Sequence, residues 1–339
     1  MDIRDIARIS GYSVGTVSRV LNGHMNVSDK ARDHVMHVVD AYHFEPNASA
    51  RELKRLDKTA IVVFVKGKNN LLFATILEKI HDLLHEQNEE VCVMYLAEDE
   101  NEVELALRYQ QARNPRGIIF LGGELKYFQE SFSRISCSSV LITNNCSRLH
   151  FPNLSSVLTD DAKGASDIAD VLIRAGHKKI AILGGNLSSG QISRRRLSGA
   201  IRRFAHAGIA VDLDRCYEPC HFSMEEGYEA AARLFARVPD CTAVFALADV
   251  IAMGAMRYVF DQGRSVPDDV SLVGFDGIEP AKYAYPRLTT VQQDTSQLAE
   301  AGVHALLRMI DGKEPVQAAR IVPHCVLMGE TVHTMHTSQ

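Results

Sequence analysis

The stretch DIRDIARISGYSVGTVSRVLN, residues 2–22, has the spacing of two short helices joined by a tight turn. Gly11 ends the first helix, and Ser13 is a suitable N-cap for a second helix whose apolar residues recur at three- and four-residue steps. Asn22 and Gly23 end that second helix, because both residue types tolerate a positive φ. The pattern predicts a helix-turn-helix, a motif that places its second helix in the major groove of DNA.

The outward face of this second helix carries side chains suited to contact DNA. Arg19 can donate two hydrogen bonds to a guanine, and Val14 can contact a thymine methyl group. Thr16 and Asn22 are within reach of phosphates. On the pattern alone, a small structural helical bundle is the alternative. The residues of this helix that we predict to contact DNA are Val14, Gly15, Thr16, Ser18, Arg19 and Asn22.

Ser28 can cap a third helix that extends to Tyr42, and a brief fourth helix is predicted over 48–55. Beyond residue 60, short β-branched runs alternate with amphipathic stretches, which is typical of parallel sheets covered by helices. The predicted strands, numerous enough to favour two sheets over one, are 60–65, 91–95, 117–121, 140–143, 156–159, 179–183, 243–248, 270–275 and 288–292. The clearest predicted helices between them are 71–87, 161–175, 192–207 and 250–262.

The composition is that of an ordinary globular chain. The 339 residues are 46% apolar and 23% charged, which excludes a disordered or fibrous protein. The net charge of −5 argues against a generally basic nucleic-acid coat, although not against one small DNA-reading module. No apolar run approaches the length of about 18 residues that would predict a membrane span, and no signal peptide is visible. Seven irregularly spaced cysteines suit a reducing cytoplasm.

Nothing in the sequence announces catalytic or metal chemistry. Cys216, Cys220 and His221 lie close together, but they have no second cluster to complete a zinc site. Gly184 and Gly185 follow a predicted strand without a Walker or dinucleotide pattern, so a tight turn is expected there. We expect no catalytic residues, no metal and no cofactor.

Several motifs in register resemble the lactose/galactose repressor family of bacterial transcriptional regulators. The N-terminal motifs resemble that family's headpiece and are IRDIA (3–7), GYS (11–13), TVSRVLN (16–22), VS (27–28), FEPN (44–47) and AREL (50–53). The later motifs resemble its effector core, which has the fold of periplasmic sugar-binding proteins, and are GHKKIA (176–181), DVIAMGA (249–255), VPDDVSLVGFD (266–276) and LTTVQQD (288–294).

The resemblance implies a small all-α helix-turn-helix headpiece and an α/β core of two doubly wound subdomains. The implied divisions are a headpiece over 1–46, a hinge helix and linker over 47–58, and an effector and dimerisation core over 59–333. Within the core, the N-subdomain is expected at about 59–157 and 290–322, and the C-subdomain at about 158–289 and 323–333.

The resemblance also assigns the segment 48–55. In the family this hinge helix folds on operator DNA, where its leucine wedges into the minor groove and kinks the duplex. Leu53 matches that leucine, Ala50 matches the small residue beside it, and Arg51 and Lys54 add positive charge. Eight residues are too few for a stable isolated helix in water, which suits folding on DNA.

The resemblance also assigns effector-binding positions, each matched separately to a residue of this sequence. Arg196 matches an arginine that holds effector hydroxyls or a carboxylate, and Asp276 matches an acidic residue at a strand end where such folds bind ligands. Ala248 departs from the family, which commonly has Asn or Ser there. The matched effector-binding positions are Phe73, Asn144, Arg196, Phe222, Asp249, Asp276 and Gln293.

The resemblance implies a ligand-responsive regulator, most often a repressor, that binds a pseudo-palindromic double-stranded operator as a homodimer. A sugar or sugar derivative is the expected effector, and a purine or nucleoside is the alternative. An enzyme on a doubly wound fold is the alternative of another class. No membrane association is expected, and the expected location is the cytoplasm, in association with the nucleoid.

Replacing the wedge leucine tests the hinge assignment. We expect Leu53→Ala to weaken operator binding strongly while effector affinity stays the same, because the kink depends on the inserted side chain. Operator affinity measured at fixed salt checks this expectation, and an unchanged affinity would contradict the wedge.

Overall fold

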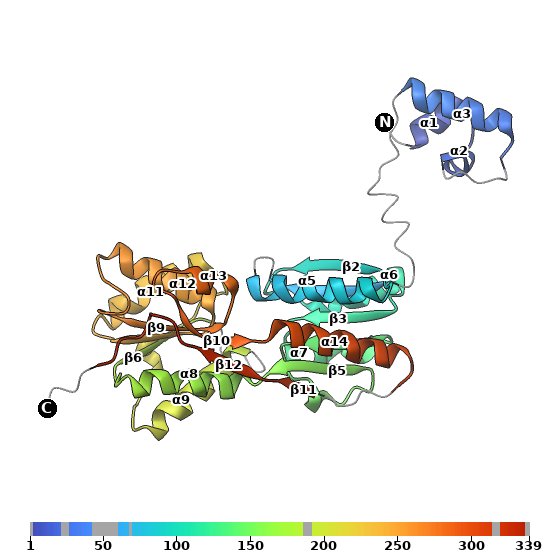
Figure 1. Ribbon diagram of the computed structural model, residues 1–339. Helices are drawn as coiled ribbons and strands as arrows, with labels where there is room; N and C mark the ends of the chain where they lie inside the picture. Colours follow the sequence, from blue (N-terminus) through green and yellow to red (C-terminus); the bar gives the residue numbers. More distant parts are fainter. Residues whose placement is uncertain are drawn as a thin grey trace. The chain divides into compact units, whose positions relative to one another are not determined.

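The computed structural model describes residues 3–21, 27–42, 60–67, 70–185, 192–313 and 319–335. The chain forms two compact units, Met1–Asp57 and Lys58–Gln339 (Figure 1). The predicted helix over 48–55 lies outside the described residues. So do the predicted DNA contacts Asn22, Ala50, Arg51, Leu53 and Lys54.

The first unit contains the expected helices α1 (Ile3–Ser10), α2 (Val14–Leu21) and α3 (Asp29–Ala41). Ser13 caps α2, since its Oγ accepts a hydrogen bond from the backbone N–H of Thr16 at 3.2 Å. The apolar stripes of the helices meet in a small core built around Ile6, Val17 and Val35, each of which is fully buried. The helix-turn-helix therefore has a core of its own.

The second unit consists of two lobes, each built on a six-stranded sheet. The N-lobe sheet is entirely parallel, with the order β11-β5-β4-β3-β1-β2. The strands are β1 (Ile61–Lys66), β2 (Val91–Leu96), β3 (Gly117–Leu121), β4 (Ser138–Ile142), β5 (Leu154–Thr159) and β11 (Ala319–Val322).

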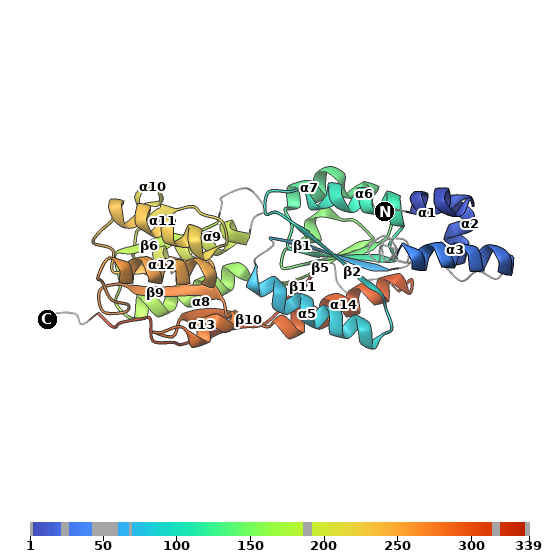
Figure 2. The same cartoon turned by 90° about the horizontal axis from the view of Figure 1, so that it is seen from above.

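Helices cover both faces of the N-lobe sheet, so its central strands are apolar throughout. On β1, Ile61 and Val63 face α5 (Leu71–Glu86) and α14 (Thr295–Ile310), while Val62 and Phe64 face α6 (Glu102–Arg113) and α7 (Leu125–Ser131). Figure 2 shows these two helical layers on opposite sides of the sheet.

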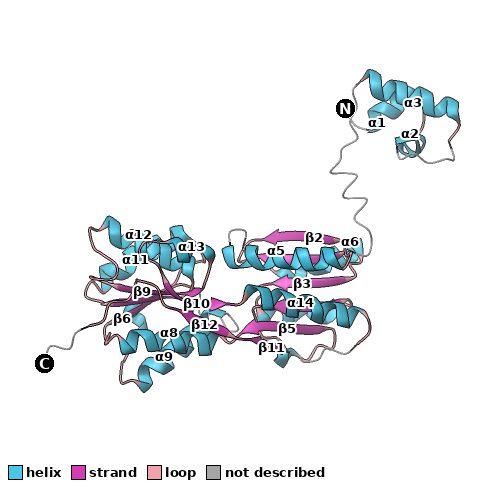
Figure 3. Ribbon diagram, viewed as in Figure 1, coloured by secondary structure: helices cyan, strands magenta, loops and turns pink. Residues whose placement is uncertain are grey.

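The C-lobe sheet has the order β12-β10-β9-β8-β6-β7, and only β12 runs antiparallel, against β10. The strands are β6 (Ile180–Leu183), β7 (Tyr217–Glu218), β8 (Ala243–Ala246), β9 (Ser271–Asp276), β10 (Thr289–Gln293) and β12 (His324–Leu327). Its helices are α8 (Asp161–Arg174), α9 (Ile192–His206), α10 (Leu213–Cys216), α11 (Met224–Arg237), α12 (Asp249–Asp261) and α13 (Glu279–Tyr283) (Figure 3).

The predicted strands are present with small shifts at their ends, whereas the sequence patterns missed β7, β11 and β12. The expected subdomain boundaries need correction at two places. β5 stays in the N-lobe sheet as far as Thr159, beyond the expected change at residue 157. β10 pairs with β9 and β12, so the chain returns to the N-lobe after Gln293 and not at residue 290.

Each crossing between the lobes is a single residue. Asp160 joins β5 to α8, Asp294 joins β10 to α14, and Pro323 joins β11 to β12. Both aspartates also cap the helix that follows, because Asp160 accepts from the N–H of Lys163 at 3.1 Å and Asp294 from that of Gln297 at 2.9 Å. The helices in the described ranges include none that is long and apolar enough to cross a membrane.

Close packing of α8 on α9 depends on Gly199. A Cβ at this position would lie 2.2 Å from the carbonyl oxygen of Ala162 and 2.8 Å from its Cα. We expect Gly199→Ala to lower the free energy of unfolding by about 1–3 kcal/mol, although alanine is the better helix former. Chemical denaturation measures the change, with the exposed neighbour Ser198→Ala as control. Equal or greater stability of Gly199→Ala would contradict the close approach.

Candidate functional site

A cavity of about 310 Å³ lies between the lobes, where the central strands of both sheets have their carboxyl ends. Both lobes contribute side chains, and aromatic, acidic and basic groups are all present. The lining residues are Lys66, Asn70, Leu72, Phe73, Glu98, Asp99, Gly122, Gly123, Glu124, Thr143, Gly185, Ile192, Ser193, Arg196, Pro219, Cys220, His221, Phe222, Glu226 and Asp276.

Arg196 is the centre of the C-lobe wall. Its Nε donates to Asp161 at 2.8 Å, and its Nη2 lies 3.0 Å from Asp276 Oδ1. Its Nη1 donates to the carbonyl oxygen of Leu247 at 2.6 Å, and the guanidinium lies 3.8 Å from the centre of the Phe275 ring. These contacts come from α8, from the residue that follows β8, and from β9, and together they fix the orientation of the arginine.

Burial and ion pairing compete at this group of charges. Burial raises the pKa of Asp161 to about 6 and also raises the pKa of Asp276, while Arg196 opposes both increases. For Arg196, burial disfavours the charged form, but the two carboxylates outweigh it and raise its pKa. The guanidinium of Arg196 therefore stays protonated, and the neighbouring carboxylates balance its charge.

Two lining residues other than glycine have a left-handed backbone. Thr143 has φ +83° directly after β4, and Asp276 has φ +121° at the end of β9. This region disfavours residues other than glycine, and a β-branched residue such as threonine especially. Such strain clusters at functional sites. It occurs here at one strand end in each lobe.

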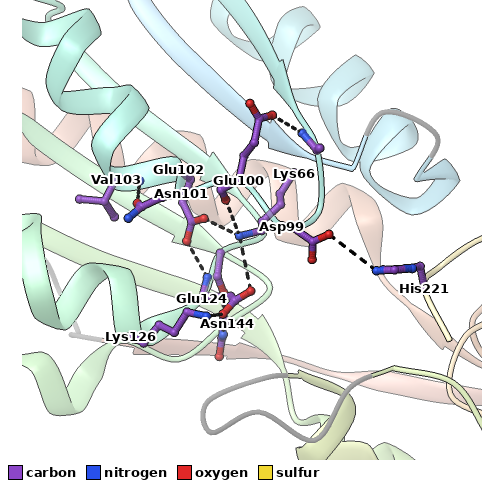
Figure 4. A network of polar contacts seen from close by, with 12 residues as sticks. Lys66, Asp99, Glu100, Asn101, Glu102, Val103, Glu124, Lys126, Asn144 and His221 are labelled. Atoms are coloured by element: carbon purple, nitrogen blue, oxygen red, sulfur yellow. Dashed lines mark hydrogen bonds and ion pairs between the residues drawn. The ribbon is translucent and has the colours of Figure 1, made fainter. Parts of the chain in front are cut away.

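The N-lobe wall contains a buried network of polar contacts around Lys66 (Figure 4). The Lys66 ammonium donates to Glu102 at 2.6 Å and to the carbonyl oxygen of Glu100 at 3.0 Å, and it lies 3.9 Å from Glu124. Glu102 also accepts from the backbone N–H of Glu124 at 2.6 Å. Burial raises the pKa of Glu102, and the charge of Lys66 opposes that increase.

Contacts between the lobes lie at one side of the cavity. The backbone N–H of Phe222 donates to Glu98 at 3.3 Å, and the His221 ring lies 3.8 Å from Asp99 (Figure 4). His221 also hydrogen-bonds Glu226 at 2.6 Å, and this bond raises the pKa of His221. Burial raises the pKa of Glu98, and His221 opposes that increase.

Of the predicted effector-binding residues, Phe73, Arg196, Phe222 and Asp276 line the cavity, and three others do not. Asn144 is not among the lining residues, although its Nδ2 donates at 3.0 Å to the carbonyl oxygen of Gly123, which does line the cavity. Its neighbour Thr143 does line the cavity, and contact of Asn144 with an effector stays a prediction.

Asp249 and Gln293 lie behind the lining residues. Asp249 is fully buried and accepts from the Thr290 hydroxyl at 2.5 Å and from the Ile278 N–H at 2.9 Å. Gln293 donates to Asp276 at 2.8 Å and so supports that carboxylate. Neither residue is among those that line the cavity, and direct contact of either with an effector stays a prediction.

Sequence reasoning missed several lining residues. Lys66 ends β1, Glu98 follows β2, Glu124 follows β3 and Thr143 follows β4. Ligands of open α/β sheets bind beyond the carboxyl ends of strands, so this rule could have identified all four.

In the headpiece, Val14, Gly15 and Arg19 are exposed on α2, as a DNA-reading face requires. Thr16 is half-buried, and its hydroxyl lies 2.9 Å from the Ser13 hydroxyl within the cap. The side chain of Ser18 lies outside the described part of the structure.

Comparison with known proteins agrees with this architecture. The family model described as bacterial regulatory proteins of the lacI family matches residues 2–47, and a model for a periplasmic binding protein-like domain matches residues 169–332. The HTH-type transcriptional regulator MalR of Clostridium butyricum is 34% identical over 316 residues, which cover 91% of this chain and 93% of that protein.

Two further similarities extend over nearly the whole chain. The ribose operon repressor of Haemophilus influenzae is 30% identical over 334 residues, covering 98% of this chain and 99% of that protein. A solved structure of a transcriptional regulator CelR–cellobiose complex has a TM-score of 0.69 and 25% identity, and covers 98% of this chain and 99% of that one.

The headpiece and the two-lobed core define a DNA-binding transcriptional regulator with an effector domain. The chain belongs to the lacI family of bacterial regulatory proteins. This membership confirms the resemblance found in the sequence, the fold class, and the expectation of a regulator in place of an enzyme.

The buried carboxyl of Asp249 predicts a dependence of stability on pH. Burial raises its pKa well above the ordinary value of 3.8, and nearby Asp276 raises it further. The folded state therefore holds the proton more tightly than the unfolded chain, and this contribution to stability is lost as the pH rises. We expect Asp249→Asn to lose less of its free energy of unfolding than the parent protein between about pH 5 and about pH 8.

Denaturant titrations over that range measure the difference. Asp214→Asn is the control, because Asp214 is exposed at the start of α10. Parallel pH profiles for Asp249→Asn and the parent would show that the buried carboxyl is not the source.

Proposed function

We propose that this protein is a repressor whose operator affinity is controlled by a sugar or sugar derivative bound between the lobes. The observation that carries the proposal is the cavity, which joins a fixed arginine–carboxylate pair, Arg196 and Asp276, to the aromatic rings of Phe73 and Phe222. Its volume of about 310 Å³ is at the small end of ligand pockets.

A hydroxylated ring matches this set of groups. Its hydroxyls can donate to the Asp276 carboxylate and accept from the Arg196 guanidinium, and its apolar C–H face can lie on an aromatic ring. We infer that Phe73, Thr143, Arg196, Phe222 and Asp276 contact the effector. Asn144, Asp249 and Gln293 act behind them as positioning residues.

The DNA-binding part of the proposal follows the family. Two headpieces of a homodimer place their second helices in successive major grooves of a pseudo-palindrome, with hinge segments over 47–58 between them. Val14, Gly15, Thr16, Ser18, Arg19 and Asn22 contact the major groove or its phosphates, and Ala50, Arg51, Leu53 and Lys54 contact the minor groove. The protein acts in the cytoplasm, in association with the nucleoid.

Control by the effector requires that the ligand distinguish two arrangements of the lobes. Because the cavity has walls from both lobes, a bound ligand stabilises one relative angle over others. The difference in effector affinity between operator-competent and incompetent dimers sets the size of the response. The purine or nucleoside alternative uses the same cavity but reverses the sign, since a corepressor increases DNA affinity.

A thermal-shift screen of the full chain tests the effector class. We expect stabilisation by at least one sugar in a panel of sugars, nucleosides and purine bases, amounting to about 2.7 kcal/mol at 100 times the dissociation constant. Phe222→Ala should weaken that binding at least tenfold, because it removes the ring from the cavity. Phe260→Ala removes a partly exposed ring from α12, away from the cavity, and should leave binding unchanged.

Stabilisation by purines or nucleosides alone would favour the alternative effector. Equal loss of sugar binding in both phenylalanine variants would place the sugar elsewhere. Operator binding with and without the stabilising sugar then gives the sign of control.

A further inference from the structure

Among the described lining residues, the arginine and the lysine are both already paired with carboxylates. Arg196 lies between Asp161 at 2.8 Å and Asp276 at 3.0 Å. Lys66 lies 2.6 Å from Glu102 and 3.9 Å from Glu124. Glu124 also pairs with the half-exposed Lys126 at 2.8 Å. Arg196 and Lys66 each lie near two carboxylates, so neither is an unpaired positive charge in the cavity.

The remaining ionisable groups make the cavity more negative. Glu98, Asp99 and Glu226 also line it, and His221 is the one further group among the described lining residues that can gain a positive charge. His221 hydrogen-bonds Glu226 at 2.6 Å and lies 3.8 Å from Asp99, so even the protonated ring is outnumbered by carboxylates. Cys220 adds no charge, because burial raises the pKa of its thiol to about 12.

The cavity also contains a buried hydroxyl, that of Thr143, which can pair with a neutral ligand group. Thr143 is 4% exposed and lines the cavity, and its Oγ1 has no hydrogen-bond partner among the described residues. A buried hydroxyl without a partner is costly, so a ligand group that pairs with it is favoured. A hydroxyl can donate to or accept from another hydroxyl, which makes a polyol its natural partner.

We propose that the cavity selects uncharged polyols and excludes the same sugars once they carry a phosphate or a carboxylate. This inference rests on the proposed sugar effector and adds the charge state of that effector. A phosphate carries a charge of about −1.5 to −2 at neutral pH and would lose water beside carboxylates that lack spare counter-charge. The hydroxyls of a neutral sugar instead donate to those carboxylates in charge-assisted hydrogen bonds.

The selection gives the regulator a defined place relative to sugar metabolism. It responds to a free sugar, as supplied by uptake without phosphorylation or by hydrolysis of a glycoside. A kinase that phosphorylates that sugar removes the signal.

Matched pairs of ligands test the proposal on the full chain. The probes are ribose with ribose 5-phosphate, glucose with glucose 6-phosphate, and cellobiose with its phosphorylated form, measured by thermal shift and calorimetry. We expect at least one neutral sugar to bind, and to bind at least tenfold more tightly than its phosphorylated partner at the same ionic strength.

Two charge-neutralising variants locate the source of the discrimination. The double variant Glu98→Gln, Glu226→Gln should lower the ratio of the affinity for the neutral sugar to that for the phosphorylated sugar at least fivefold. The main cause should be tighter binding of the phosphorylated sugar. Glu225→Gln is the matched control, because Glu225 is exposed on α11 beside Glu226 and does not line the cavity. It should leave the preference unchanged.

The outcomes separate this inference from the function on which it rests. If a phosphorylated sugar binds as tightly as its neutral partner, or more tightly, the charge selection is wrong and the sugar effector stands. If no member of any pair binds, the sugar effector is itself wrong, and the selection with it. An unchanged preference in the double variant would overturn the role of the carboxylates.

Discussion

The buried ion group of Arg196, Asp161 and Asp276 is the interaction on which the cavity depends. It brings together one side chain each from α8, α9 and β9, and the ring of Phe275 lies against the guanidinium. Removing one member would leave a buried charge without compensation, at a cost of several kcal/mol. The group therefore holds the C-lobe wall rigid whether or not a ligand is bound, and a rigid wall keeps the cost of ordering low on binding.

Much of the fold was predictable because strands of a sheet that helices cover on both faces are continuous apolar runs in the sequence. Strand β1, with Ile61–Val65 buried throughout, reads as a short apolar run from the sequence alone. Strand β7 has only two residues, and β11 exposes Arg320 and Ile321 at a sheet edge, so neither has such a run. Their existence depends on neighbouring strands, and local sequence does not encode it.

The site was predictable only in part, and for a different reason. Arg196 and Asp276 were found because they stand in motifs shared with a family. Asn144 is adjacent to the lining residue Thr143 but does not line the cavity itself, and sequence alone does not show which of two neighbours at a strand end faces a cavity. The approach of Glu98 to Phe222 joins residues far apart in the chain and on different lobes, and sequence spacing carries no information on such a contact.

The single-residue crossings at Asp160, Asp294 and Pro323 form a short hinge between the two lobes. Because two of these residues cap helices, the torsions that can turn without breaking a cap are few. Opening and closing then lose or gain little chain entropy, since there is no slack loop to order. A short connection of this kind favours rotation of one lobe against the other over sliding between them.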